Sequence, residues 1–320
     1  MTDGSWHDGA VRRWHAHAWN TETSLSLIRG IIPKVPRWLV PAIAVPTTAI
    51  CLAYMRNERR AARSNLARIL GGRGMALHRT TWRLFYNFSK FMVSYCELGD
   101  LTADEVRSRA SDADRDVERI ARALSGGRGV IVLTAHLGNW EAGLRLLEGA
   151  GAPVNVAMRI DHANPVEARL VALRQSGSIH VIPVGDDPSS VLSLRAALGR
   201  NEILAVQGDR PSGQRSLLAP VFGAPLPLPV GPFLLAYLTG APLLPAFFLQ
   251  EGWWRFRSEI HEAIAFPRTG DRDADLAAGA AAYGAALETM LRRHPDQWFC
   301  FYDAWQPAEG DPGAWTAAAG

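Results

Sequence analysis

The sequence has few cysteines and almost no lysine. Its three cysteines, Cys51, Cys96 and Cys300, are widely spaced, and no CxxC motif or Cys/His cluster accompanies them. This arrangement supports neither a disulfide framework nor a structural zinc, so we expect no metal and a reducing cytosolic setting. Arginine outnumbers lysine 32 to 2, a bias that we attribute to genome composition and not to chemistry.

Several catalytic and cofactor-binding motifs are absent as well. No GxSxG occurs, so the strand-to-helix turn that presents the nucleophile of a serine hydrolase or thioesterase is not supported. Gly127 and Gly129 precede a predicted strand, whereas a dinucleotide-binding fold needs its glycines after the strand. The chain also lacks a Walker loop and a metal-binding histidine pair.

The chain is rich in apolar residues and unevenly charged. Apolar residues make up 48% of the 320 residues, enough for a folded protein with a sizeable core. Residues 1–100 hold 14 Lys+Arg against 6 Asp+Glu, a net +8, whereas residues 101–320 hold 20 against 25, a net −5. We therefore expect the N-terminal third to meet an anionic partner, either a phospholipid surface or nucleic acid.

An uncharged stretch lies inside this basic third. Residues 38–55 are 18 consecutive uncharged residues, the lower limit for a membrane-spanning helix, and Pro41 and Pro46 would kink such a helix. Basic residues flank the stretch on both sides, which suits anionic lipid better than nucleic acid. We expect a helical, membrane-associating extension over residues 1–57, without a secretory signal. The alternative is a helical hairpin packed on the main domain.

Hydrophobic periodicity predicts two helices before residue 100. The first covers residues 58–70, and a glycine-rich break at 71–74 separates it from the second, over 76–98. Aromatic side chains recur in the second helix at steps of three and four residues. A stripe of this kind usually faces a core; the alternative is that it lines a groove for an apolar chain.

From residue 113 onward, helical patterns alternate with short β-branched apolar runs. This alternation indicates βαβ units, and we predict an α/β fold with a mostly parallel central sheet flanked by helices. Residues 58–308 are assigned to this domain and residues 309–320 to a tail. After Pro220 we expect a surface loop before a short helix near 232–239. The predicted strands are 129–134, 153–158, 179–184, 202–207 and a hairpin of 243–250 with 253–264, and a terminal helix covers 274–293.

One histidine stands where parallel-sheet proteins place their ligands. His136 follows the predicted strand 129–134, and Glu141 opens the next helix. The loop between them lets the carboxylate fold back onto the imidazole, and the helix dipole favours the ionised carboxylate. A carboxylate on one ring nitrogen keeps the other nitrogen basic, so His136 can take a proton from an attacking hydroxyl. The alternative is a buried histidine at a strand end, with Glu141 an ordinary N-terminal helix acid.

Several ordered blocks resemble the lysophospholipid acyltransferase superfamily. TAHLGNWE, residues 134–141, is similar to the HxGNWE block of the late acyltransferases of lipid A biosynthesis and of the mycobacterial phosphatidylinositol mannoside acyltransferases. The likeness spans roughly residues 60–306. Its further blocks are RRAARSNL (59–66), VFGAPLPLPVGPFLLAYLTGAPLLP (221–245) and HPDQWF (294–299).

The resemblance implies roles for four residues. His136 would be the general base and Glu141 its orienting partner, and Arg174 and Asp209 would line the same site. An arginine such as Arg174 can bind a phosphate or polarise a thioester carbonyl. The alternatives are a surface arginine on a helix for Arg174 and a turn residue for Asp209.

Three further residues are weaker candidates for binding an anionic substrate. These are Arg159, Arg210 and Asn139, of which Asn139 can equally be a helix N-cap and nothing more. The chain also departs from both family types. Lipid A enzymes usually show Asp-Gln or Asp-His where this chain has Asp209-Arg210, and the mycobacterial type carries a Glu where this chain has Arg159. The acceptor therefore stays open.

The resemblance implies an acyltransferase with no tightly bound cofactor. Acyl-carrier protein or coenzyme A would bring the fatty acyl group as a thioester co-substrate. A lipid A-like glycolipid is the expected acceptor, with a mannosylated phosphatidylinositol, a lysophospholipid or a specialised lipid as alternatives. The expected location is the cytoplasmic face of the bacterial inner membrane. A catalytically inert membrane-surface protein of the same fold is the non-enzymatic alternative, nucleic-acid binding is not expected, and the oligomeric state is open.

Overall fold

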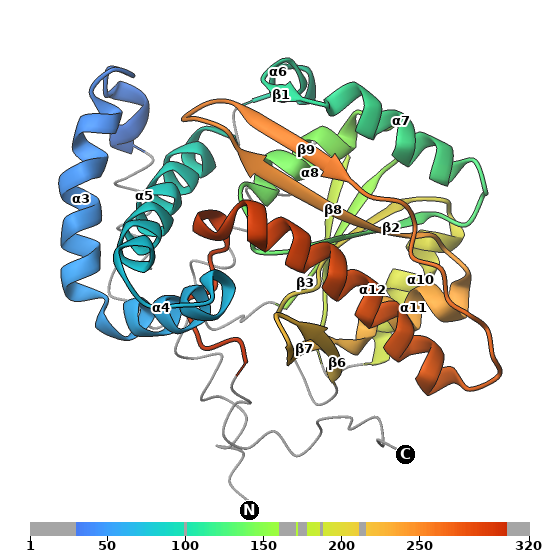
Figure 1. Ribbon diagram of the computed structural model, residues 1–320. Helices are drawn as coiled ribbons and strands as arrows, with labels where there is room; N and C mark the ends of the chain where they lie inside the picture. Colours follow the sequence, from blue (N-terminus) through green and yellow to red (C-terminus); the bar gives the residue numbers. More distant parts are fainter. Residues whose placement is uncertain are drawn as a thin grey trace, which may run out of the picture.

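A computed structural model describes residues 30–98, 101–159, 171, 178–185, 188–210 and 216–305. Arg174, the predicted tail at 309–320 and the first 29 residues of the predicted extension lie outside these ranges. Figure 1 shows a twisted sheet with helices packed on both of its faces.

The described elements have the following bounds. The helices are α3 (Val40–Tyr54), α4 (Arg56–Leu70), α5 (Met75–Leu98), α6 (Ala103–Ser108), α7 (Ala113–Leu124), α8 (Trp140–Glu148), α10 (Pro188–Gly199), α11 (Val230–Thr239) and α12 (Arg272–Arg293), with 3-10 turns η1 (Ile32–Lys34) and η2 (Pro295–Gln297). The strands are β1 (Ala110–Ser111), β2 (Val130–Thr134), β3 (Val154–Met158), β4 (Ile179–Pro183), β5 (Ile203–Gln207), β6 (Ser216–Val221), β7 (Ala224–Pro229), β8 (Leu243–Gln250) and β9 (Phe256–Ile260).

The central sheet has seven strands in the order β1-β9-β8-β2-β5-β3-β4. Its neighbours run parallel except for β8 and β9, which form the predicted antiparallel pair. The α/β prediction is therefore confirmed. The strands predicted from apolar runs at 129–134, 153–158, 179–184 and 202–207 agree with β2, β3, β4 and β5 to within one residue at each end.

The central strand β2 has a core on each of its faces. Successive side chains of a strand point to opposite faces, so Ile131 and Leu133 join the cluster with α4, α5, α11 and α12, whereas Val130 and Val132 join the cluster with α7 and α8. Every residue of β2 is buried. This double burial explains why the strand reads as a continuous apolar run and not as an alternating one.

The prediction of a surface loop after Pro220 was wrong. Residues 216–229 form a two-stranded antiparallel hairpin, β6 and β7, which packs against α12. In β7 the prolines at 225, 227 and 229 alternate with the buried Leu226 and Leu228. A two-stranded ribbon tolerates proline because a strand with only one neighbour leaves alternate N–H groups unpaired. The high proline content hid an ordinary period of two.

The apolar stretch at 38–55 forms the single helix α3, which packs against α5. Within the described ranges, no helix is long and apolar enough to cross a membrane. The aromatic stripe of α5 takes its core role at Phe85 and Phe91, which are buried and lie against aromatic rings of the C-terminal segment. The core interpretation of that stripe is thus confirmed at these two positions.

A buried asparagine fixes the C-terminal segment to α4. The Asn65 amide nitrogen donates to the carbonyls of Cys300 (3.2 Å) and Tyr302 (2.7 Å), and its oxygen accepts the Ala304 N–H (3.1 Å). Asn65 is buried, and its bonds to the Cys300 carbonyl and the Ala304 N–H are buried as well, so these groups cannot turn to water instead. The segment after η2 is therefore held by one side chain on a distant helix.

We predict that Asn65→Ala lowers the free energy of unfolding by about 2–4 kcal/mol, because it leaves the buried Cys300 carbonyl and Ala304 amide without their partner and removes one donor from the partly buried Tyr302 carbonyl. Urea denaturation followed by circular dichroism measures this change. Asn57→Ala on the exposed side of α4 is the matched control and should cost less than about 0.5 kcal/mol. Equal losses in the two variants would contradict the assignment.

Candidate active site

The pairing of two parallel strands brings His136 next to Asp209. Thr134 ends β2 and lies in register with Gln207, which ends β5. His136 and Asp209 each stand two residues beyond these ends, and the Gly208 N–H donates to the Thr134 carbonyl (2.7 Å) to continue the ladder. Both side chains therefore leave the same carboxyl edge of the sheet, where parallel-sheet proteins bind ligands.

Asp209 holds the histidine ring through its carboxylate. Oδ1 lies 2.8 Å from Nδ1 of His136, and Oδ2 accepts the His136 backbone N–H at 3.0 Å and the Trp298 indole N–H at 2.8 Å. Asp209 is 2% exposed, and burial alone would raise its pKa. The charge and hydrogen bonds of His136, together with the Trp298 bond, outweigh burial and hold the pKa of Asp209 below its ordinary value.

An ionised Asp209 determines which ring nitrogen carries the proton. A carboxylate only accepts hydrogen bonds, so Nδ1 of His136 donates to it and Nε2 of the neutral ring carries the lone pair. His136 itself is 14% exposed. The arrangement is that of a general base held in one tautomer.

The loop that carries His136 is fixed by the backbone on both sides. The His136 carbonyl accepts the Phe299 N–H (2.8 Å), and the Gly138 N–H donates to the Gln297 carbonyl (2.9 Å). Gly138 has a φ of 71°, and a Cβ there would lie 2.2 Å from the Phe248 carbonyl oxygen. Only glycine suits this position, which lets the loop pass close over β8.

Glu141 occupies the first turn of α8 beside the histidine loop. It is buried, and its Oε1 accepts the Trp140 indole N–H at 3.1 Å. The Trp140 ring in turn packs edge-on against the His136 ring, with centroids 5.2 Å apart. Sequence analysis placed Glu141 on one ring nitrogen of His136 without specifying which, and Nδ1 is bonded to Asp209. The role of Glu141 stays a prediction.

Two of the other predicted site residues, Arg159 and Arg210, lie at the carboxyl edge of the sheet, and Asn139 has a structural contact of its own. Arg159 directly follows β3, a neighbour of β5, and is exposed at the same edge of the sheet, while Arg210 lies over the Tyr302 ring at 5.1 Å. Asn139 is buried, and its side chain accepts the Ala142 N–H as the N-cap of α8. The N-cap interpretation of Asn139 is thus confirmed. Arg174 lies outside the described residues.

Sequence reasoning missed the aromatic residues that surround Asp209. The Tyr302 hydroxyl donates to the Asp209 carbonyl (3.2 Å), and the Tyr283 hydroxyl donates to the Thr134 carbonyl (2.8 Å). Burial raises the pKa of both tyrosines well above the ordinary value, so both stay protonated donors. The one signal for Trp298 was the HPDQWF block, which indicated no role.

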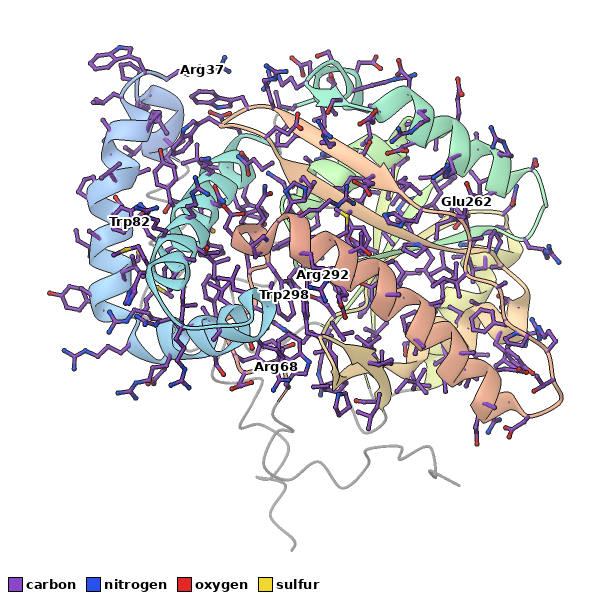
Figure 2. All side chains as sticks on the ribbon, in the orientation of Figure 1. Arg37, Arg68, Trp82, Glu262, Arg292 and Trp298 are labelled. Carbon is purple, nitrogen blue, oxygen red and sulfur yellow. The ribbon has the colours of Figure 1, made fainter. Side chains whose placement is uncertain are left out.

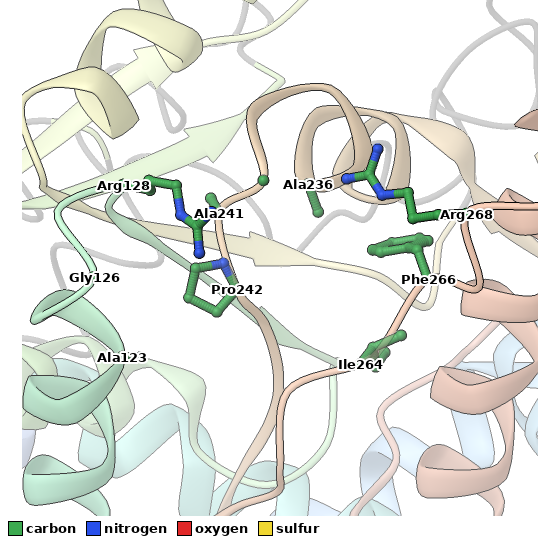
Figure 3. A pocket seen from close by; sticks show the side chains of 10 residues that line it. Ala123, Gly126, Arg128, Ala236, Ala241, Pro242, Ile264, Phe266 and Arg268 are labelled. Atoms are coloured by element: carbon green, nitrogen blue, oxygen red, sulfur yellow. The ribbon is translucent and has the colours of Figure 1, made fainter.

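The described residues around the site offer neither a cysteine thiolate nor a group of three metal ligands. Burial raises the pKa of Cys300 to about 12, so this neighbouring thiol stays protonated at neutral pH. Within the described ranges no group of three His, Cys, Asp or Glu could hold a metal ion. A cavity of about 220 Å³ lies elsewhere, at the amino ends of β2 and β8, and is lined by Arg128 and Arg268 (Figure 3).

These features define an α/β protein with a histidine–carboxylate pair at the carboxyl edge of its sheet. The chain belongs to the bacterial lipid A biosynthesis acyltransferase family, whose model matches residues 16–307. It is therefore an acyltransferase that acts on lipid-type acceptors and uses an acyl donor.

Two mycobacterial proteins illustrate its relatives. A phosphatidylinositol mannoside acyltransferase of Mycobacterium tuberculosis strain H37Rv is 28% identical over 251 residues, 76% of each chain. A protein of the same name from Mycolicibacterium smegmatis is 26% identical over 193 residues, 59% of this chain and 61% of the relative.

We predict that Asp209→Asn makes the protein less stable at pH 7 by about 1–3 kcal/mol. The substitution replaces the carboxylate by a neutral amide, and the charge-assisted hydrogen bond to His136 is lost. The pKa of Asp209 is lower in the folded state, so its contribution is present above the unfolded value and is lost as pH falls through the folded value. The difference between parent and variant in urea denaturation should therefore shrink as the pH falls below the ordinary pKa of an aspartate. A difference that is constant with pH would contradict this.

Proposed function

We propose that the protein transfers a fatty acyl group from a thioester to a hydroxyl of a membrane glycolipid, with His136 as general base. The observation that supports this best is the hydrogen bond between His136 Nδ1 and a buried, ionised Asp209 at the carboxyl edge of the sheet. Family membership supplies the acyl chemistry, and the site supplies a base for an alcohol.

The reaction needs no covalent enzyme intermediate. Nε2 of His136 takes the proton of the acceptor hydroxyl while its oxygen attacks the thioester carbon. The tetrahedral intermediate collapses as the carbon–sulfur bond breaks, and the proton on Nε2 passes to the leaving thiolate. Asp209 stabilises the transient imidazolium, and the carboxyl group of Glu141 lies one side chain away, across Trp140.

The acceptor that the comparisons favour is a mannosylated phosphatidylinositol or a glycolipid like it. The curated relatives carry the name phosphatidylinositol mannoside acyltransferase. Exposed Arg159 and partly buried Arg210, both at the carboxyl edge, suit an anionic lipid headgroup. Arg174 is assigned to the same headgroup or to the thioester carbonyl on the family resemblance. A lipid A-like glycolipid is the second candidate, because the family model is that of lipid A acyltransferases.

We predict that His136→Ala lowers the rate of acyl transfer about 10²–10⁴-fold, because the acceptor hydroxyl loses its base. The assay supplies radiolabelled acyl-coenzyme A or acyl-carrier protein with phosphatidylinositol mannoside or a lipid A precursor in mixed micelles. The preferred pair identifies donor and acceptor.

The matched control is His261→Ala. His261 also pairs with a carboxylate, Glu259 (3.1 Å), but it follows β9 at the opposite end of the sheet. This variant should keep the activity of the parent. Equal activity of parent and His136→Ala with every donor and acceptor would contradict the assignment of His136 as general base.

We also propose that α3 rests on the cytoplasmic face of the inner membrane. Five large apolar side chains of α3 and its flanks point to solvent: Trp38, Ile43, Val45, Ile50 and Tyr54. Exposed basic residues stand at both ends of the helix, among them Lys34, Arg37, Arg56 and Arg60. Arg37 and Trp82 lie on the side of the molecule formed by α3 and α5 (Figure 2). An uncharged apolar helix with basic ends fits an anionic lipid surface.

We predict that the double variant Trp38→Ser and Tyr54→Ser binds anionic vesicles at least about tenfold more weakly, because each side chain is nearly fully exposed (78% and 79%) and available to lipid. Flotation with phosphatidylglycerol–phosphatidylcholine vesicles measures the affinity. Val191→Ser with Leu192→Ser, which removes two exposed apolar side chains from α10, is the control and should bind like the parent. A similar loss in both variants would refute a docking surface on α3.

A further inference from the structure

The third donor to Asp209 comes from the far end of the chain. Trp298 follows η2 directly (Figure 2), is buried, and donates its indole N–H to Oδ2 of Asp209 at 2.8 Å. Its backbone forms an antiparallel bridge with Leu137, the residue after His136. The indole and the histidine loop are therefore fixed to each other as well as to the same carboxylate.

We infer that Trp298 is a positioning residue for acyl transfer, which fixes the Asp209 carboxylate and tunes the basicity of His136 without contacting the substrate. The inference rests on the proposed function of His136. With Oδ2 occupied by the Trp298 indole and the His136 backbone amide, Oδ1 is directed at Nδ1 of the ring. The carboxylate then has a single orientation relative to the imidazole.

The Trp298 indole also weakens the electrostatic attraction between the Asp209 carboxylate and the His136 imidazolium. An N–H dipole that points at a carboxylate stabilises its negative charge and reduces its proton affinity. Without that donor, the charge of Asp209 acts more fully on the ring, and the protonated form of His136 becomes more favourable. Only the neutral imidazole can accept a proton. If the ring protonates more readily, activity therefore falls at a higher pH as the solution is acidified.

The chain offers a matched pair of tryptophans. Trp305 packs on Trp298 with ring centroids 5.7 Å apart, and its indole N–H donates to the Val221 carbonyl at 3.3 Å. Trp305→Phe therefore removes an indole hydrogen bond from the same aromatic cluster without changing the donors to Asp209. It separates loss of packing from loss of the Asp209 bond.

The experiment measures kcat/KM for acyl transfer against pH in the parent, Trp298→Phe and Trp305→Phe. Trp298→Phe should move the acidic limb up by about half a pH unit or more and lower the plateau about three- to tenfold. Trp305→Phe should leave the acidic limb where the parent has it. An acidic limb that is unmoved in Trp298→Phe, or moved equally in both variants, overturns the inference.

A second measurement requires neither activity nor a folded Trp298 variant. In the ¹H–¹⁵N spectrum of the otherwise unchanged protein, the indole protons of Trp298 and Trp140 should both lie downfield, because each has a carboxylate acceptor, Asp209 for Trp298 and Glu141 for Trp140. Only the Trp298 signal should move upfield in Asp209→Asn, because only its acceptor changes. If no indole signal responds in this way, the bond and the inference fail. If instead His136→Ala transfers acyl groups as fast as the parent, the proposed function fails, whatever the indole spectrum shows.

Discussion

The site depends on the register of β2 against β5. Both strands end at positions that pair with each other, and both loops place a functional side chain two residues later. A slip of one residue would put Asp209 opposite a neighbour of His136 that cannot accept or donate a proton. The register is set by the two buried faces of β2, whose alternate side chains fill separate cores. The geometry of the His136–Asp209 pair is thus a consequence of core packing.

A buried carboxylate is costly unless donors surround it. Asp209 has three donors to its two oxygens and a fourth, the Tyr302 hydroxyl, on its own carbonyl. Two of the three carboxylate bonds come from His136 itself, so most of what stabilises the charge also orients the imidazole. The low pKa of Asp209 and the fixed tautomer of His136 therefore have one common cause.

Sequence reasoning predicted both residues of the His136–Asp209 pair but not the hydrogen bond between them. His136 was recognised as a residue just past a buried strand, Asp209 was assigned to the site by the family resemblance, and the strand bounds were nearly correct. The hydrogen bond between His136 and Asp209 was not anticipated, because the strand order that brings Asp209 close is set by packing across the whole sheet. The β6–β7 hairpin was missed for another reason, since its prolines concealed the alternation of buried leucines.

The hydrogen bond from the C-terminal segment to Asp209 is the feature that sequence patterns indicated least. Trp298 is 89 positions from Asp209, and the segment reaches the site only because η2 and the following residues run back beside the histidine loop. Asn65 on α4 holds the far side of that same segment by three hydrogen bonds. A continuous series of short contacts therefore runs from α4, through residues 298–304, to the carboxylate that orients His136. Because α4 and α3 both pack on α5, this series of contacts connects the helical layer that contains α3 to the His136–Asp209 pair.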